Sequence, residues 1–357
     1  MTITAVLIVK NESNTIARCL RSLKSYVDGF VIVDTGSTDD TVEIIERSLA
    51  GIPHEIHHRE WIDFGHNRTE ALALAGEEGH LLLADADFEY SFGPGWRDQI
   101  TDADMHYITI HEAGTQYRYA GLLRADKEWS YVGSTHEYVD CAGATRANLE
   151  GTSITHHADG GCRDEKFERD LAFLLKDVQE DPTNARALFY LANTLRDMGR
   201  YTEAVPHYLR RFDMGGWDEE AWTALYRAGE CQALVGEWHR AVFTLEQAYE
   251  LRPTRLEPLY ALATGHREQG ERQAAYWATC RGMGKPKSND ALFVASWVWD
   301  YGLLFEHSIS AYWVGQYEES ITACRALLER PDLPENYRTQ TERNLQYALD
   351  ARTSAHA

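Results

Sequence analysis

The sequence predicts an α/β domain with a mainly parallel sheet over residues 1–165, followed by an all-α repeat solenoid over residues 166–357. In the first part, short unbroken apolar runs alternate with amphipathic segments, a pattern typical of parallel strands covered by helices on both faces. In the second part the periodicity is helical throughout, and glycines recur at intervals near 34 residues. A length of 357 residues also suits two domains.

The elements of the first domain follow from local patterns. We expect strands over residues 3–9, 30–33, 54–58 and 81–83, and helices over residues 16–23, 41–49 and 64–74. Ligands of parallel sheets bind at the carboxyl ends of the strands, so the segments that follow three of these strands are candidate site residues. They are Lys10, Asn11 and Glu12; Asp34, Thr35, Gly36 and Ser37; and Asp85, Ala86 and Asp87.

The second domain repeats a helix–glycine–helix unit. Gly199, Gly236 and Gly270 are 37 and 34 residues apart, and Gly315 belongs to a further copy after an insertion. This period matches tetratricopeptide repeats, which stack helix pairs and leave a concave surface suited to peptides. Two roles remain open: binding of an acceptor, or a rigid support or dimerisation arm. Residues 336–351 are expected to form a polar capping helix.

Composition and charge exclude several classes of protein. The net charge is −21, of which −15 falls in residues 1–165, so a nucleic-acid partner is disfavoured. If this acidic domain binds an anionic diphosphate, a divalent metal is expected to mediate. The chain contains neither an apolar run long enough to span a membrane nor a basic, cleavable leader, so we expect a cytoplasmic protein. The six cysteines are scattered, which favours neither a zinc site nor a disulfide framework.

Asp85 and Asp87 carry the metal hypothesis. Two carboxylates at positions i and i+2, where a strand gives way to a loop, can turn toward one cation. Such a pair is common by chance and could equally form a helix cap or a solvated turn. Three converging strand-end loops with complementary polar residues favour the binding site.

These motifs together carry a family resemblance. The segments LIVKNES, VIVDTGSTDDT, WIDFGHNRTEAL and LLLADAD resemble the family 2 glycosyltransferases of GT-A fold, over about residues 1–160. Joined to tetratricopeptide repeats that include RRFDMGGWDEEAW, the chain is similar to a bacterial and viral subgroup with members that glycosylate peptides or proteins. The resemblance implies an inverting hexosyltransferase that uses a nucleotide-sugar donor, expected to be a UDP-sugar, and Mn²⁺ or Mg²⁺. The expected acceptor is a protein, peptide or glycan, and the repeats would present the acceptor or form a homodimer.

The resemblance also implies roles for single residues. It places Asp34 on the nucleobase or ribose, Arg68 on the nucleotide phosphates, and Asp85 and Asp87 on the metal and ribose. His156 would be a further metal ligand, with the neighbouring His157 as the alternative. The other nucleotide contacts that we expect are Val9, Lys10, Asn11, Glu12, Gly36, Ser37, Asn67 and Ala86.

The catalytic base is expected in the segment Thr135-His136-Glu137, which is similar to a short His-Glu signature of family relatives. Many relatives present an aspartate in a Glu-Asp pair instead, and this chain departs from that pattern. An inverting transferase needs a group that accepts the acceptor proton. Glu137 suits this role because a crowded carboxylate cleft raises a carboxyl pKa. The alternatives are His136, Asp159 and Asp164.

Two other functions compete with this interpretation. A nucleotidyltransferase would be expected to carry a glycine-rich loop after the first strand, where this chain has Lys10-Asn11-Glu12. A tetratricopeptide binding scaffold with an inactive transferase domain is the alternative, and the metal carboxylates argue against it.

Overall fold

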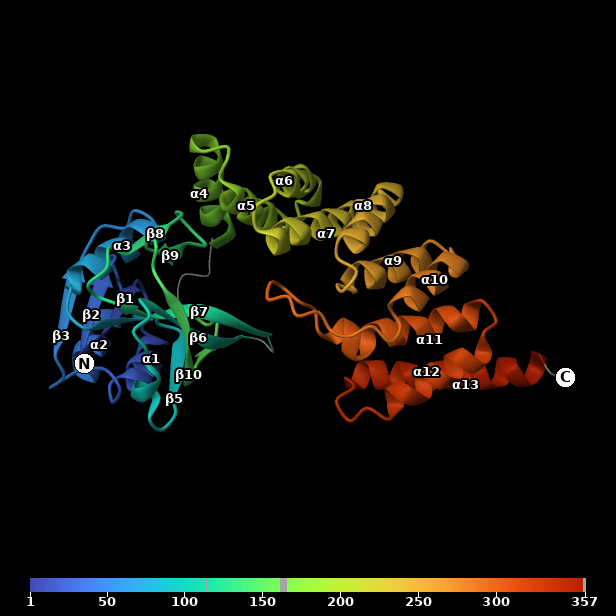
Figure 1. The fold of residues 1–357 in the computed structure, drawn as a ribbon, viewed down its shortest axis with the longest axis horizontal. Helices are drawn as coiled ribbons and strands as arrows, with labels where there is room; N and C mark the ends of the chain where they lie inside the picture. The colour runs from blue at the N-terminus through green and yellow to red at the C-terminus, as the bar shows by residue number, and fades with distance from the viewer. Residues whose placement is uncertain (113–114, 161–165, 356–357) are drawn as a thin grey trace. The chain divides into compact units, whose positions relative to one another are not determined.

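The computed structural model describes residues 1–112, 115–160 and 166–355. Its contacts divide the chain into two compact units, Met1–Pro182 and Thr183–Ala357. Helix α4 (Lys166–Glu180) therefore belongs to the first unit, whereas the second domain was predicted to begin at residue 166. The units are drawn as one ribbon in Figure 1 and are described separately below.

The first unit is built on an eight-stranded sheet of order β3-β2-β1-β4-β7-β6-β10-β5. Strands β3 (His54–His58), β2 (Gly29–Asp34), β1 (Ile3–Val9) and β4 (His80–Ala84) are parallel neighbours. The remaining strands are β5 (Phe88–Phe92), β6 (Met105–Glu112), β7 (Thr115–Arg124) and β10 (Arg146–His156). Strand β7 is antiparallel to both β4 and β6, while β6 and β10 are parallel. A separate ribbon pairs β8 (Ser130–Val132) with β9 (Tyr138–Asp140).

Alternation along β1 explains why helices cover both faces of this sheet. Ile3, Ala5 and Leu7 pack in one apolar cluster with residues of α1 (Ile16–Leu23) and α2 (Thr41–Ser48), whereas Val6 packs in a second cluster beside α3 (Phe64–Leu74). Neighbouring side chains of a strand point to opposite faces, so one buried strand feeds both cores. The predicted α/β class with a mostly parallel sheet is confirmed. A short 3-10 helix, η1 (Trp96–Gln99), follows β5.

The second unit consists of helices, as predicted for a tetratricopeptide solenoid. They are α5 (Ala185–Asp197), α6 (Tyr201–Asp213), α7 (Asp218–Leu234), α8 (Trp238–Leu251), α9 (Glu257–Glu268), α10 (Arg272–Gly282), η2 (Val298–Gly302), α11 (Leu303–Trp313), α12 (Tyr317–Leu328) and α13 (Glu335–Ala355). From α5 to α10, and again from α11 to α13, each helix packs against the next.

The repeat glycines end the first helix of each pair. Gly199, Gly236, Gly270 and Gly315 have φ angles of 74°, 81°, 78° and 81°. This left-handed conformation is strained for residues with a Cβ atom, so glycine is required where the chain turns from one helix to the next. The glycine period in the sequence thus marks the helix–helix turns. The predicted capping helix corresponds to α13, where Leu345 and Leu349 are half-buried.

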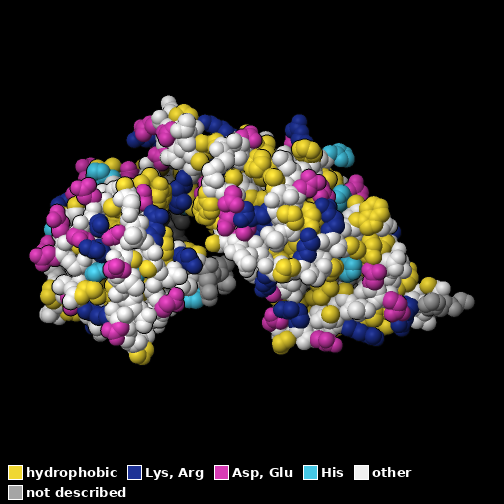
Figure 2. Space-filling model, viewed as in Figure 1, with side chains coloured by type: hydrophobic (Ala, Val, Ile, Leu, Met, Phe, Trp, Pro, Cys, Tyr) yellow, Lys and Arg dark blue, Asp and Glu magenta, His cyan; other side chains and the backbone are white. Residues whose placement is uncertain are grey.

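The surfaces agree with the composition. Acidic side chains are spread over the visible face of the first unit, and apolar side chains are exposed on the repeats (Figure 2). Trp222 is buried, whereas Trp217, Trp277 and Trp313 are exposed, so packing does not account for every tryptophan of the repeats. Among the described residues, no helix is long and apolar enough to cross a membrane.

Candidate functional site

Three strand-end loops share one edge of the sheet. Val9 at the end of β1 is in register with Asp34 at the end of β2, and Leu7 of β1 is in register with Ala84 at the end of β4. The segments that begin at Lys10, Thr35 and Asp85 therefore emerge side by side. This edge is where a parallel sheet is expected to bind its ligand.

Hydrogen bonds join the first two loops. The Asn11 amide donates to Ser37 Oγ (3.0 Å), the Thr38 amide donates to Asn11 Oδ1 (2.8 Å), and the Glu12 amide donates to Thr41 Oγ1 (2.7 Å). Asn11 has a φ of 56°, a conformation that asparagine tolerates better than most residues. Hydrogen bonds through the side chains of Asn11 and Ser37 thus join the loop after β1 to the loop after β2.

Asp34 lies at the floor of this part of the edge. The side chain is 5% exposed, its Oδ1 accepts the Ser37 amide (3.1 Å), and its Oδ2 lies 3.1 Å from Nδ1 of His58. His58 ends β3 and is largely exposed. His58 was not among the predicted site residues, although its place at the end of the neighbouring strand was a usable signal. Together these residues form a carboxylate–imidazole pair of the kind that could bind a base or ribose.

Arg68 joins the Asp85–Asp87 loop to the predicted base. Its guanidinium pairs with Asp85 Oδ1 at 2.5 Å and with Glu137 Oε1 at 2.7 Å, and it lies over the Tyr131 ring at 5.6 Å. The Arg68 side chain is only 12% exposed. Although burial opposes its charge, the two carboxylates raise its pKa well above the usual value. Arg68 therefore bridges two site carboxylates.

Packing fixes the loop that carries Glu137. The Phe64 amide donates to the Ser134 carbonyl (3.1 Å), and a Cβ at Gly65 would lie 2.2 Å from the Gly133 carbonyl oxygen, so only glycine allows this approach. On the other side, Ser134 Oγ donates to Asp177 Oδ1 of α4 (2.7 Å). The loop is thus held between α3 and α4. This contact explains why α4 belongs to the first unit.

The same loop contains His136, which has a φ of 50°. Thr135 is buried and donates to the buried Asp170 of α4 (3.3 Å). Glu137 is 12% exposed, and desolvation raises the pKa of its carboxyl despite the nearby Arg68. A carboxylate with a raised pKa is a better proton acceptor than an ordinary surface carboxylate.

Asp87 faces His156 rather than His157. His156 Nε2 lies 3.1 Å from Asp87 Oδ2, whereas His157 Nε2 lies 2.8 Å from Glu89 Oε2. The antiparallel pairing of β10 with β5 sets this choice, because His156 is in register with Phe88, next to Asp87. Burial acts to raise the pKa of the Asp87 carboxyl, but the hydrogen bond with His156 lowers it, and the pKa lies below its usual value. Of the two histidines, His156 is the one placed to share a ligand with Asp87.

The surroundings of Asp87 bear on the predicted metal. Across the described ranges, no group of three or more His, Cys, Asp or Glu side chains is arranged to hold a metal ion. Asp87 and His156 nevertheless offer an oxygen and a nitrogen ligand, and a Cβ at Gly160 would lie 3.3 Å from Asp87 Oδ2 and 3.4 Å from Glu12 Oε1. This donor set fits a divalent cation whose remaining ligands come from water or a bound phosphate.

The other predicted residues take different positions. Asn67 is fully buried, and its amide accepts from Ile62 and donates to the Glu60 carbonyl, so it braces the loop before α3. Val9 is buried, and its carbonyl accepts from Thr35. Ala86 is buried, Lys10 is half-buried, and Gly36 has a φ of 100°.

Of the two carboxylates predicted as alternative catalytic bases, Asp159 lies within the described residues. Asp159 pairs with Arg18 at 2.6 Å, and this hydrogen bond lowers the pKa of Asp159. A carboxylate stabilised in its charged form is a poorer proton acceptor than Glu137. Asp164 lies outside the described residues.

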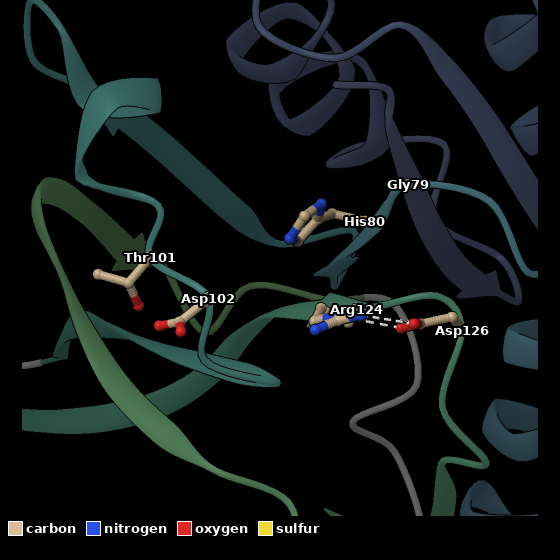
Figure 3. Close-up of a pocket in the computed structure, with 6 residues that line it drawn as sticks. All are labelled: Gly79, His80, Thr101, Asp102, Arg124 and Asp126. Carbon is tan, nitrogen blue, oxygen red and sulfur yellow. Dashed lines mark hydrogen bonds and ion pairs between the residues drawn. The ribbon is translucent and has the colours of Figure 1, made fainter.

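A pocket of about 330 Å³ lies at the opposite edge of the sheet, at the start of β4 (Figure 3). Its lining residues are Gly79, His80, Thr101, Asp102, Arg124 and Asp126. None of these residues belongs to the strand-end loops described above.

Comparison with known proteins identifies both parts. Residues 4–106 match the family model described as glycosyl transferase family 2, and residues 187–220 match a tetratricopeptide repeat. The first unit carries a family 2 glycosyl transferase domain. The strand ends that carry Asn11, Asp34 and Asp85 all lie within this match, as does helix α3 with Arg68.

Similar proteins cover parts of the chain. Over 91 residues it is 38% identical to the SPbeta prophage-derived glycosyltransferase SunS of Bacillus subtilis, covering 25% of this chain and 21% of SunS. A TPR repeat-containing protein of Synechococcus elongatus is 31% identical over 144 residues (38% of this chain, 34% of that protein). An uncharacterized glycosyltransferase of Rickettsia conorii is 36% identical over 89 residues (25% and 30%). The chain thus spans about a fifth to a third of the length of these relatives.

Among solved structures, MamA aligns with 54% of this chain and 92% of its own at 15% identity and a TM-score of 0.37. TTC0263, a thermophilic TPR protein of Thermus thermophilus, aligns with 51% of this chain and 91% of its own at 14% identity and a TM-score of 0.36.

Proposed function

We propose that the protein is a metal-dependent inverting hexosyltransferase that moves a sugar from a UDP-sugar to a protein, peptide or glycan acceptor. The observation that carries this proposal is the Arg68 bridge, which holds Asp85 of the donor loop and the high-pKa carboxyl of Glu137 in one cluster. Inverting transfer needs a donor-binding carboxylate and a proton acceptor close to each other.

Each loop has a part in the reaction. Asp34 and His58 bind the base or ribose at one end of the edge, and Asp85 positions the donor at the other. Asp87 and His156 would hold Mn²⁺ or Mg²⁺, which when bound neutralises charge on the diphosphate. Glu137 accepts the proton of the acceptor as the nucleophile attacks the anomeric carbon. Arg68 keeps Glu137 oriented toward the donor.

The test is calorimetry of the full chain with a panel of nucleotide sugars, with Mn²⁺ and with EDTA. We expect one UDP-sugar to bind in the presence of Mn²⁺ and to lose most of its affinity in EDTA. Asp87→Asn should lose the Mn²⁺-dependent part of the affinity, whereas the matched control His157→Gln should keep it. Equal binding in EDTA would exclude the metal, and binding of no nucleotide sugar would exclude the transferase function.

A further inference from the structure

The insertion between α10 and η2 runs back along the repeats. Residues 285–295, here named the strap, contain neither helix nor strand. In Figure 1 the strap is the orange segment that projects away from α10 before the chain returns to α11. Its contacts lie on α5, α7 and the region from the end of α8 into α9, so it crosses the first helices of three successive pairs.

The repeats hold the strap by its main chain. Glu219 Oε2 of α7 accepts the amides of Ala291 (2.9 Å) and Leu292 (2.8 Å). Arg255 donates to the carbonyls of Leu292 (3.2 Å) and Phe293 (3.0 Å). Glu257 Oε1 of α9 accepts a further strap amide, that of residue 295, at 3.1 Å. Such contacts recognise a polypeptide backbone whatever its side chains.

Two side chains add specificity. Asp290 makes a two-pronged pair with Arg252, at 2.6 and 2.9 Å, and also accepts from Arg255 at 3.3 Å. Three residues later, the Phe293 ring lies 4.3 Å below the Arg227 guanidinium and 6.3 Å from the Phe189 ring. The strap thus places an acidic residue in a basic subsite and, three positions later, an aromatic residue in a second subsite.

Two repeat residues that bind the strap, Arg255 and Glu257, pair with each other at 2.8 Å and would lose their other hydrogen bonds if nothing occupied this face. Arg255 and Glu257 are both 1% exposed, and buried charged groups are costly when they lose hydrogen-bond partners. The strap itself is not an ideal fit. Phe293 has a φ of 48°, which is strained for a bulky residue, and its side chain stays half exposed. A segment that places an aromatic ring there without this strain would compete well.

We propose that this face of the repeats is a peptide-binding surface and that the strap is its internal occupant. The partner is an unstructured protein segment with an acidic residue followed three positions later by an aromatic one, and it binds by displacing the strap. Because the tethered strap acts at an effective concentration on the order of mM, the intact protein binds such a segment weakly. The inference concerns binding by the second unit and is independent of the transfer reaction.

The probe is a fluorescent synthetic peptide with the sequence of residues 286–297. It is titrated by anisotropy against the full-length chain and against the full-length double variant Asp290→Ala, Phe293→Ala. We expect the variant to bind the peptide at least tenfold more tightly than the wild type. A peptide with the same two substitutions should lose at least tenfold in affinity, whereas a control peptide with Asn289→Ala, an exposed position, should bind unchanged.

Hydrogen exchange of the wild-type chain gives a second test that does not depend on the variant folding. Excess peptide should speed the exchange of the amides of Ala291 and Leu292 while the amides of α9 stay protected. Unchanged exchange would overturn the proposal. So would a variant that melts like the wild type but does not bind the peptide, because the strap would then be a brace. If the variant or the wild type forms a dimer in which the strap of each copy lies on the repeats of the other, the occupant is a second copy of this chain.

Discussion

The substitution Glu137→Gln tests the proposed chemistry most directly. It keeps the shape of the side chain and removes its capacity to accept a proton. Arg68 keeps its partner Asp85, so the guanidinium is not left unpaired in a buried position. Burial raises the pKa of Glu137, which means that the fold favours the neutral carboxyl and loses stability as pH rises through that raised pKa. A neutral glutamine is therefore expected to leave the protein folded.

The expected loss of activity follows from the position of Glu137. Its side chain is 12% exposed, so bulk water cannot easily take over as proton acceptor. A positioned general base contributes about 10²- to 10⁴-fold in rate, or about 3–5 kcal/mol in activation free energy. We expect kcat to fall by that factor while the dissociation constant for the donor changes by less than about threefold, since Glu137 acts on the acceptor.

The assay is single-turnover transfer followed by intact mass, with donor affinity measured by calorimetry. Glu89→Gln is the matched control, because Glu89 is an exposed carboxylate that pairs with His157. In the wild type, kcat should rise with pH through a value above the usual 4.5 of a glutamate carboxyl, because the ionised form is the active one. This acid limb should vanish in Glu137→Gln. A variant that keeps kcat within threefold of the wild type would refute the role of Glu137.

Three further outcomes are expected. His58→Ala should weaken nucleotide binding at pH 7 by about three- to tenfold with unchanged melting temperature, because its ring is exposed beside Asp34; unaltered affinity by calorimetry would contradict that contact. Gly65→Ala should lower stability by about 1–3 kcal/mol in urea unfolding and also lower kcat, because its Cβ would collide with the loop that carries Glu137. A chain that ends at Pro182 should bind and turn over the donor, whereas a chain that ends at residue 165 lacks α4 and should lose donor turnover. Equal turnover by the two truncated chains would show that α4 does not support the loop that carries Glu137.

Much of the fold could be predicted from local patterns. The strands expected at residues 3–9 and 54–58 coincide with β1 and β3. Strand β1 is an unbroken apolar run, as buried parallel strands are, whereas β3 is a polar edge strand in which Ile56 is the one apolar residue. The local patterns predicted none of the strands from β5 to β10. Strand β10 carries charged residues, and its pairing with β6 is interrupted between Asn148 and Ser153, so no clean alternation marks it.

The site was predictable by position but not by pairing. The order of strands places Asp34 and Asp85 at one edge, and this follows from the βαβ pattern. The bridge of Arg68 to Glu137 could not be inferred, because the two residues are far apart in the chain and a long flexible side chain has many candidate partners. In the sequence, the strap is indicated only by the longer spacing between the repeat glycines Gly270 and Gly315. This spacing shows that the repeats contain an insertion, but not where on their surface the insertion lies.

The hydrogen bonds between the Asn11 and Ser37 loops have a kinetic consequence. Because each loop already satisfies a main-chain amide of the other, the end of the proposed nucleotide site at Asn11 and Ser37 is shaped during folding and does not wait for a ligand. The entropy of ordering these loops is then absent from the binding step. Association of the nucleotide should accordingly be a single fast phase, without the slow rearrangement that follows binding when a site forms around its ligand.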